Sequence, residues 1–172
     1  AAESAFSICE SHFAEQDLLK VRNTEKQKRI LEQITAFLDQ QNLRSTPTKP
    51  LEEVLRRARS EWNETFPSQS DCLKERKEQF EKSQRNLHEL IKEKKNENQS
   101  KKESLIERAH SLCQEEPTPK VIEEIKDIQG EWRKTDRTHK KIEQILWKRF
   151  RDICDQIFHQ RRLARSDERA LL

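Results

Sequence analysis

Apolar positions along the chain recur at the spacing of one face of an α-helix. The pattern i, i+1, i+4, i+7, i+8 occurs twice, 75 residues apart, in Ile30, Leu31, Ile34, Phe37 and Leu38 and in Leu105, Ile106, Ala109, Leu112 and Cys113. Each set predicts a helix that buries a single stripe, and the similarity of the two sets indicates an internal repeat.

A second set of equivalent positions follows at a shift of 70 residues and is anchored by two tryptophans, Trp62 and Trp132. Phe80 and Phe150 form another pair at the same shift. The further pairs are Leu51 and Val121, Leu55 and Ile125, Ala58 and Ile128, and Leu87 and Ile157. The change from 75 to 70 falls in the segment after Leu38, where a loop tolerates an insertion.

Each unit is expected to hold three helices, and the second unit has the more regular pattern. Its first helix is expected over about 101–114. Thr118 then caps the second helix, with Pro119 at its first position, where the missing N–H costs nothing. A turn is expected at 134–138. The third helix carries apolar residues that we expect to face inward: Ile142, Ile145, Leu146, Phe150, Ile153, Cys154, Ile157 and Phe158.

The first unit is a poorer copy of the second. Polar residues replace four of the apolar ones on its third helix, namely Glu75, Arg76, Ser83 and Gln84. We therefore expect looser packing there. The segment 8–13 resembles the segment 153–158, so the first residues are expected to form the last helix of a preceding unit.

The composition fits long helices with narrow buried stripes. Apolar residues make up 31% of the chain and charged residues 39%, against roughly 45–50% and 25% in an average globular protein. We predict an all-α fold of tandem three-helix repeats joined by long shared helices in an elongated, rod-like arrangement. The expected segments are a preceding helix (1–22), a first repeat (23–92), a charged helical connector (93–104), a second repeat (105–165) and the start of a following segment (166–172). The connector contains no apolar residue and is expected to be a solvated helix.

The sequence pattern also indicates a compartment. The four cysteines form no CxxC pair, which favours a reducing, cytoplasmic setting over a disulfide framework. We see no apolar run long enough to span a membrane and no secretory leader. The chain is expected to be an excerpt from a longer protein.

Residues 128–158 resemble a bacterial repeat family catalogued as domain of unknown function number 349. The similar part is a Trp that closes one helix, a turn, and then Leu146-Trp147-Lys148-Arg149-Phe150-Arg151. The resemblance is good over 101–165 and weaker over 25–91, where Lys77 stands in place of Trp147. It implies tandem charged three-helix units in a larger bacterial protein, and no catalytic residue.

Candidate chemistry is sparse. A single glycine, Gly130, excludes a glycine-rich phosphate loop. Glu107 and His110 have the ExxH spacing of di-iron bundles, but such sites need a second motif and further glutamates. The cysteines lie on apolar stripes and are expected to pack in the core. Trp62, Trp132, Phe80 and Phe150 are expected to be structural anchors, whereas Trp147 lies at the edge of its stripe, where it is either core or a contact surface.

The charge distribution suggests where partners bind. Residues 133–172 carry 12 basic and 6 acidic side chains, while residues 1–132 are slightly acidic. Candidate residues for binding a partner or nucleic acid are Arg133, Lys134, Arg137, Lys140, Lys141, Trp147, Lys148 and Arg151.

We predict a non-enzymatic scaffold or protein-interaction module without a cofactor, a metal or a small-molecule substrate. The alternative is a nucleic-acid-binding module, RNA- or ribosome-associated, that uses the basic region 133–165.

Overall fold

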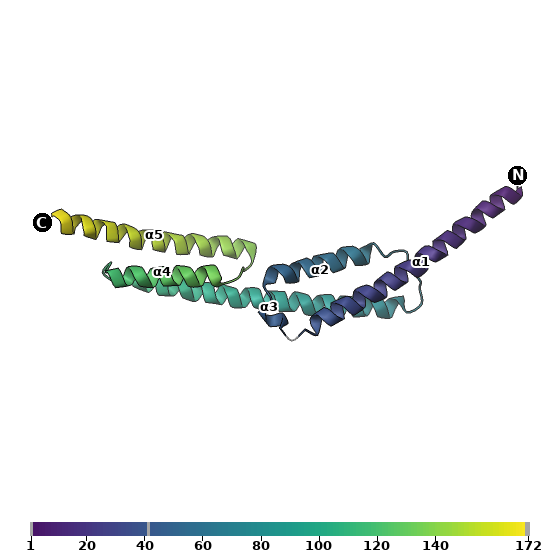
Figure 1. Cartoon of the computed structure of the whole chain (residues 1–172), viewed down its shortest axis with the longest axis horizontal. Coiled ribbons are helices and arrows are strands. Elements are labelled where there is room, and N and C mark those ends of the chain that lie inside the picture. Colours follow the sequence, from purple (N-terminus) through teal and green to yellow (C-terminus); the bar gives the residue numbers. More distant parts are fainter. Residues whose placement is uncertain (1, 41, 171–172) are drawn as a thin grey trace. The chain divides into compact units, whose positions relative to one another are not determined.

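The computed structural model describes residues 2–40 and 42–170, and the regular secondary structure in these ranges is helical throughout. The α-helices are α1 (Ala2–Leu38), α2 (Thr48–Asn63), α3 (Leu73–Cys113), α4 (Pro119–Lys134) and α5 (Lys140–Ala170), with a short 3-10 helix, η1 (Leu43–Ser45), between α1 and α2 (Figure 1). The predicted all-α class is confirmed. Within the described ranges, no helix combines the length and the apolar character needed to cross a membrane.

The chain divides into two compact units, residues 1–91 and 92–172. Helix α3 contributes to both, because its first part packs in the first unit and its last part in the second. The segments expected as 1–22 and 23–38 lie together in α1, and the expected connector 93–104 lies inside α3. The tandem-repeat interpretation and the rod-like shape stay predictions.

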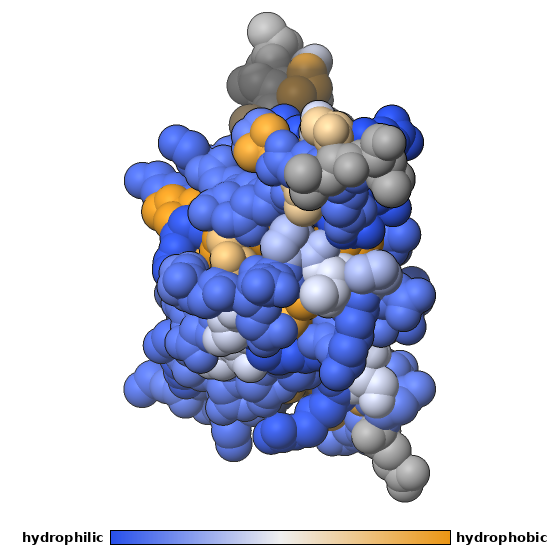
Figure 2. All heavy atoms as spheres, turned by 90° about the vertical axis from the view of Figure 1, so that its left-hand side faces the viewer, coloured by the Kyte–Doolittle hydropathy of each residue, from blue (hydrophilic) through white to orange (hydrophobic). Residues whose placement is uncertain are grey.

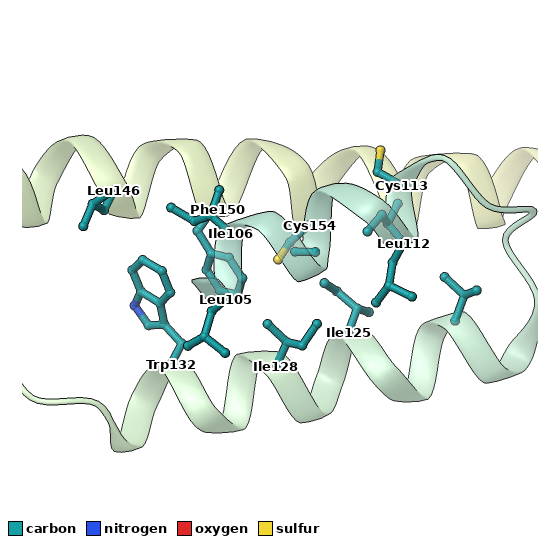
Figure 3. Close-up of a cluster of buried hydrophobic side chains, with 13 residues drawn as sticks. Leu105, Ile106, Leu112, Cys113, Ile125, Ile128, Trp132, Leu146, Phe150 and Cys154 are labelled. Atoms are coloured by element: carbon teal, nitrogen blue, oxygen red, sulfur yellow. The ribbon is translucent and has the colours of Figure 1, made fainter. Parts of the chain in front are cut away.

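The second unit has one continuous apolar core. Thirteen buried residues from α3, α4 and α5 form it, and those of α4 are Val121, Ile125, Ile128 and Trp132. Figure 3 shows how side chains from the three helices point toward one another in this core. The expectation for Ile145 is wrong, because its side chain is 60% exposed. Its neighbour Leu146 takes the inward direction, and adjacent helical positions point about 100° apart.

The apolar core of the first unit is smaller and divided. One cluster has six buried residues around Trp62 and Phe80, and the other has five around Leu51 and Leu87. Arg76 is buried at the position that corresponds to Leu146. Polar contacts thus replace part of the apolar core that the second unit has.

Burial of the cysteines was predicted correctly for Cys113 and Cys154 and wrongly for Cys9 and Cys72, which are exposed. Cys72 precedes α3 with a φ of 53°, in the left-handed region, and so lies outside the helical stripe. The face drawn in Figure 2 is mostly hydrophilic, with hydrophobic residues in small groups. Such a surface is expected of helices that each bury a narrow stripe.

Candidate interaction site on α4 and α5

The site is built where α4 ends and α5 begins. As predicted, α4 starts behind Thr118, whose Oγ1 accepts a hydrogen bond from the backbone N–H of Val121, and Pro119 occupies the first turn. The last turn of α4 carries Arg133 and Lys134. Cationic side chains are favourable at a helix C-terminus, where the peptide dipoles leave a partial negative charge.

A stacked aromatic pair holds α5 against α4. The rings of Trp132 and Phe150 lie parallel, 4.3 Å apart between centroids and 3° apart in angle, and both side chains are buried. The same arrangement occurs 70 residues earlier, where Trp62 and Phe80 stack at 4.2 Å and 7°. Both units therefore use one aromatic stack at equivalent positions, and Trp132 and Phe150 are seen together in Figure 3.

Trp147 extends this aromatic pair to the surface. Its ring centroid lies 6.0 Å from that of Trp132 and 6.4 Å from that of Phe150, yet 49% of the residue is exposed. A shallow groove of about 210 Å³ runs beside it, lined by Gln129, Trp132 and Arg133 of α4 and by Trp147, Phe150 and Arg151 of α5. The buried aromatic pair thus supports an exposed indole between two guanidinium groups. We name this region the Trp147 groove.

The predicted basic residues all reach solvent. The side chains at Arg133, Lys134, Arg137, Lys140, Lys141, Lys148 and Arg151 are exposed. Arg151 pairs with Asp155 at 3.6 Å, and both side chains are about two-thirds exposed, so solvent weakens this pair. Within residues 2–40 and 42–170, the other six have no ion pair to a carboxylate. Lys140, Trp147 and Arg151, at spacings of seven and four, lie along one face of α5.

Sequence reasoning missed a buried polar network beside this site. Asn98 and Lys102 of α3 are 8% and 3% exposed, although their segment was expected to be solvated. The Nδ2 of Asn98 donates to the backbone oxygen of Arg137 at 3.1 Å. The ammonium of Lys102 donates to Oε1 of Glu143, whose other oxygen accepts from the N–H and the hydroxyl of Thr138. The network fixes the turn between α4 and α5 to α3.

The environment of Glu143 favours its charged form. Burial raises the pKa of this carboxyl, but the hydrogen bonds from Lys102 and Thr138 and the charge of Lys102 outweigh burial, so the net pKa is lowered. The Lys102 ammonium also lies 5.1 Å from the centroid of the Trp132 ring, within the range of a cation–π contact. The ion pair and the aromatic stack are therefore parts of one structure.

The first unit has a corresponding network at the equivalent positions. Asn23, which is 75 residues before Asn98, donates to the backbone oxygen of Pro67, which is 70 residues before Arg137, at 2.7 Å. Gln27 corresponds to Lys102 and is fully buried. It donates to the hydroxyl of Thr65 and accepts from Nε of Arg76, both at 3.0 Å. No periodic apolar signal marks these residues, so only the equivalence of the asparagines at the two shifts could have found them.

The groups considered for catalysis are poorly placed for it. Glu107 and His110 are both exposed on α3, and the described residues contain no cluster of histidine, cysteine and carboxylate side chains that could hold a metal. Desolvation raises the pKa of the Cys154 thiol; a hydrogen bond with Gln129 opposes this shift, and Asp155 adds to it. A raised pKa disfavours the thiolate that a cysteine nucleophile needs.

The fold and the site define a class: an all-helical protein in which an aromatic stack and a buried polar contact recur in two units. Residues 70–141 match the model of the family described as Domain of Unknown Function (DUF349), and this segment belongs to that family. The expected resemblance is thereby confirmed, although the matched range differs from 101–165. It comprises α3, α4 and the first residues of α5, and stops before Trp147. No curated protein and no solved structure gives a significant match.

Proposed function

We propose that the chain is a non-enzymatic helical scaffold that binds other proteins as part of a larger cytoplasmic bacterial protein. The observation that carries the proposal is the first half of α1. Phe6, Ile8, Phe13 and Leu18 are each at least 65% exposed. Large apolar side chains gathered on one exposed element mark a surface that another protein covers.

Burial along α1 begins abruptly at residue 23. Asn23, Thr24 and Gln27 are at most 4% exposed, and the apolar residues from Ile30 onward belong to a core cluster. The preceding residues lie on the same helix and have no such cover within the described part of the chain. The apolar side chains before residue 23 are therefore available to a partner.

The likeness of α1 to α5 indicates what kind of partner covers it. Ile8 and Phe13 precede Ile153 and Phe158 by the same 145 residues. In α5, the latter two pack against the thirteen-residue core of the second unit. We infer that the first half of α1 packs in the same way against a helical unit of the same kind.

Sedimentation of the whole chain tests this proposal, because a second copy supplies such a unit. We expect reversible association that increases with concentration, and the variant Ile8→Glu/Phe13→Glu to abolish it. The matched control is Ile145→Glu, which places the same charge at an exposed isoleucine of α5. Hydrogen exchange should slow in residues 4–21 on association. Monomers at every concentration, or association that both variants leave intact, would contradict the proposal.

The basic side chains without ion pairs support nucleic-acid binding as a second candidate function. Between residues 133 and 151 the chain has eight basic and two acidic residues, and one of the acids, Glu143, is paired with Lys102. Binding of labelled RNA and DNA at two salt concentrations tests this candidate. Reversal of Lys140, Lys141 and Arg151 to glutamate should weaken binding and reduce the salt slope by roughly two for single strands. Absence of binding at low salt would refute it.

A further inference from the structure

We propose that the Trp147 groove is a stacking site for an unpaired base of a single-stranded nucleic acid. The inference rests on the second candidate function and goes further, because it names the strand type and the residue that contacts the base. It starts from the position of Trp147, half of which is exposed although two aromatic rings lie within 6.4 Å of it.

The indole is both accessible and held in place. Trp132 and Phe150 stack on each other beneath it and are at most 6% exposed, so the floor of the groove is rigid. An aromatic side chain supported in this way keeps a ring face or edge toward solvent at little conformational cost. A groove of about 210 Å³ is of a size suited to one planar ring system and too small for a folded segment.

Charge complementarity selects an anionic ligand. Arg133 and Arg151 line the groove, and Lys140 lies on the same face of α5 as Trp147 and Arg151. A single strand offers phosphates to these side chains and a base to the indole at the same time. A duplex keeps its bases stacked inside, where an exposed side chain cannot reach a base face without opening the helix.

The first unit provides an internal comparison. The residues 70 positions before Arg133, Trp147 and Arg151 are Asn63, Lys77 and Glu81. All three are exposed, so fold and exposure are matched while the aromatic group is absent and one charge is reversed. The aromatic and basic character of the Trp147 groove is therefore specific to the second unit and is not required by the stacked Trp–Phe pair.

Equilibrium binding to four probes tests the proposal: single-stranded RNA and single-stranded DNA of about 16 nucleotides, an abasic strand of equal length, and a duplex. We expect Trp147→Ala to weaken binding of the two single strands by about five-fold or more, because stacking on an aromatic side chain contributes that much per base. Binding of the abasic strand and the duplex should stay within about two-fold. Trp147→Phe should restore most of the loss.

The control is Ile145→Ala, which removes an exposed apolar side chain from the opposite face of α5. It should change no affinity. An equal loss for the abasic strand, or no loss for either single strand, would overturn the proposal. So would Trp147-dependent binding of an acidic peptide without a Trp147 effect on the strands, which would assign the groove to protein. Failure of every nucleic acid to bind at low salt refutes the second candidate itself, whereas binding that depends on Lys140 and Lys141 but not on Trp147 refutes only the stacking site.

Discussion

Replacing Glu143 with alanine removes the counter-ion of a buried ammonium and tests the polar network directly. Lys102 is 3% exposed at its side chain and Glu143 29%. Removing one partner of a buried ion pair typically costs about 3–5 kcal/mol, because the remaining charge stays desolvated. The N–H and hydroxyl of Thr138 also lose their acceptor, while the contact of Lys102 with Trp132 offsets part of the loss.

A double replacement separates the value of the pair from the cost of breaking it. In Lys102→Met/Glu143→Leu neither charge remains, and the free energy of unfolding should recover to near that of the wild type or exceed it. The matched control is Glu131→Ala, since the pair of Arg108 with Glu131 also joins two helices but is about half exposed on both sides. Its loss should cost under about 1 kcal/mol.

Urea unfolding measures these differences, followed by circular dichroism and tryptophan fluorescence. The two probes should give coincident transitions, because α3 runs through both units. A Glu143→Ala variant no less stable than Glu131→Ala would show that the charge on Lys102 is solvated. A double variant as unstable as the single one would show that the side-chain volume, and not the charge, matters.

The same carboxylate predicts a pH dependence. The pKa of Glu143 is lowered from its ordinary value of 4.5 in the folded state, so the folded state binds its proton less readily than the unfolded state does. The stabilisation is therefore present above about pH 4.5 and is lost as the pH falls through the folded pKa. The difference in stability between the wild type and Glu143→Gln should shrink over that window. A difference that does not change below pH 4.5 would contradict this assignment.

Three further predictions concern cysteines and the core. A thiol reagent should modify two cysteines quickly and two only on unfolding, the quick pair being Cys9 and Cys72 and the slow pair Cys113 and Cys154; mass spectrometry of the labelled peptides distinguishes them. Cys72→Gly should stabilise the chain by about 0.5–1 kcal/mol, because glycine adopts a positive φ without strain, whereas Cys9→Gly, within α1, should not stabilise it. Ile125→Ala should cost about 2–5 kcal/mol in urea unfolding, because Ile125 is fully buried.

The helices could be predicted from the sequence because their apolar residues repeat at helical spacing. Thr118 and Pro119 even fixed the start of α4. Periodicity left the burial of Ile145 and Leu146 undecided, since two adjacent residues at the edge of a stripe cannot both face the core. It also could not reveal that Cys72 lies outside the helix, because a left-handed residue leaves no hydrophobic signal.

The site was predictable only in its charged and aromatic parts. The basic residues around Trp147 could be listed because their charge is visible in the sequence and nothing in the fold buries it. Asn98 and Lys102 could not be found, because they lie in a segment without apolar residues. Their burial depends on Glu143 and on a backbone carbonyl about 40 residues away. Contacts between polar groups distant in sequence have no periodicity to detect.

The two asparagine contacts imply an asymmetry in how this sequence can drift. Asn23 and Asn98 each donate to a main-chain oxygen, one belonging to a proline and the other to an arginine. Every residue type supplies that oxygen, so mutation at the turn leaves the contact intact, whereas mutation of the asparagine removes it. Among related chains, the helix position should thus vary far less than the turn it holds. An Asn positioned before a variable turn is a better marker of a further unit than the turn sequence itself.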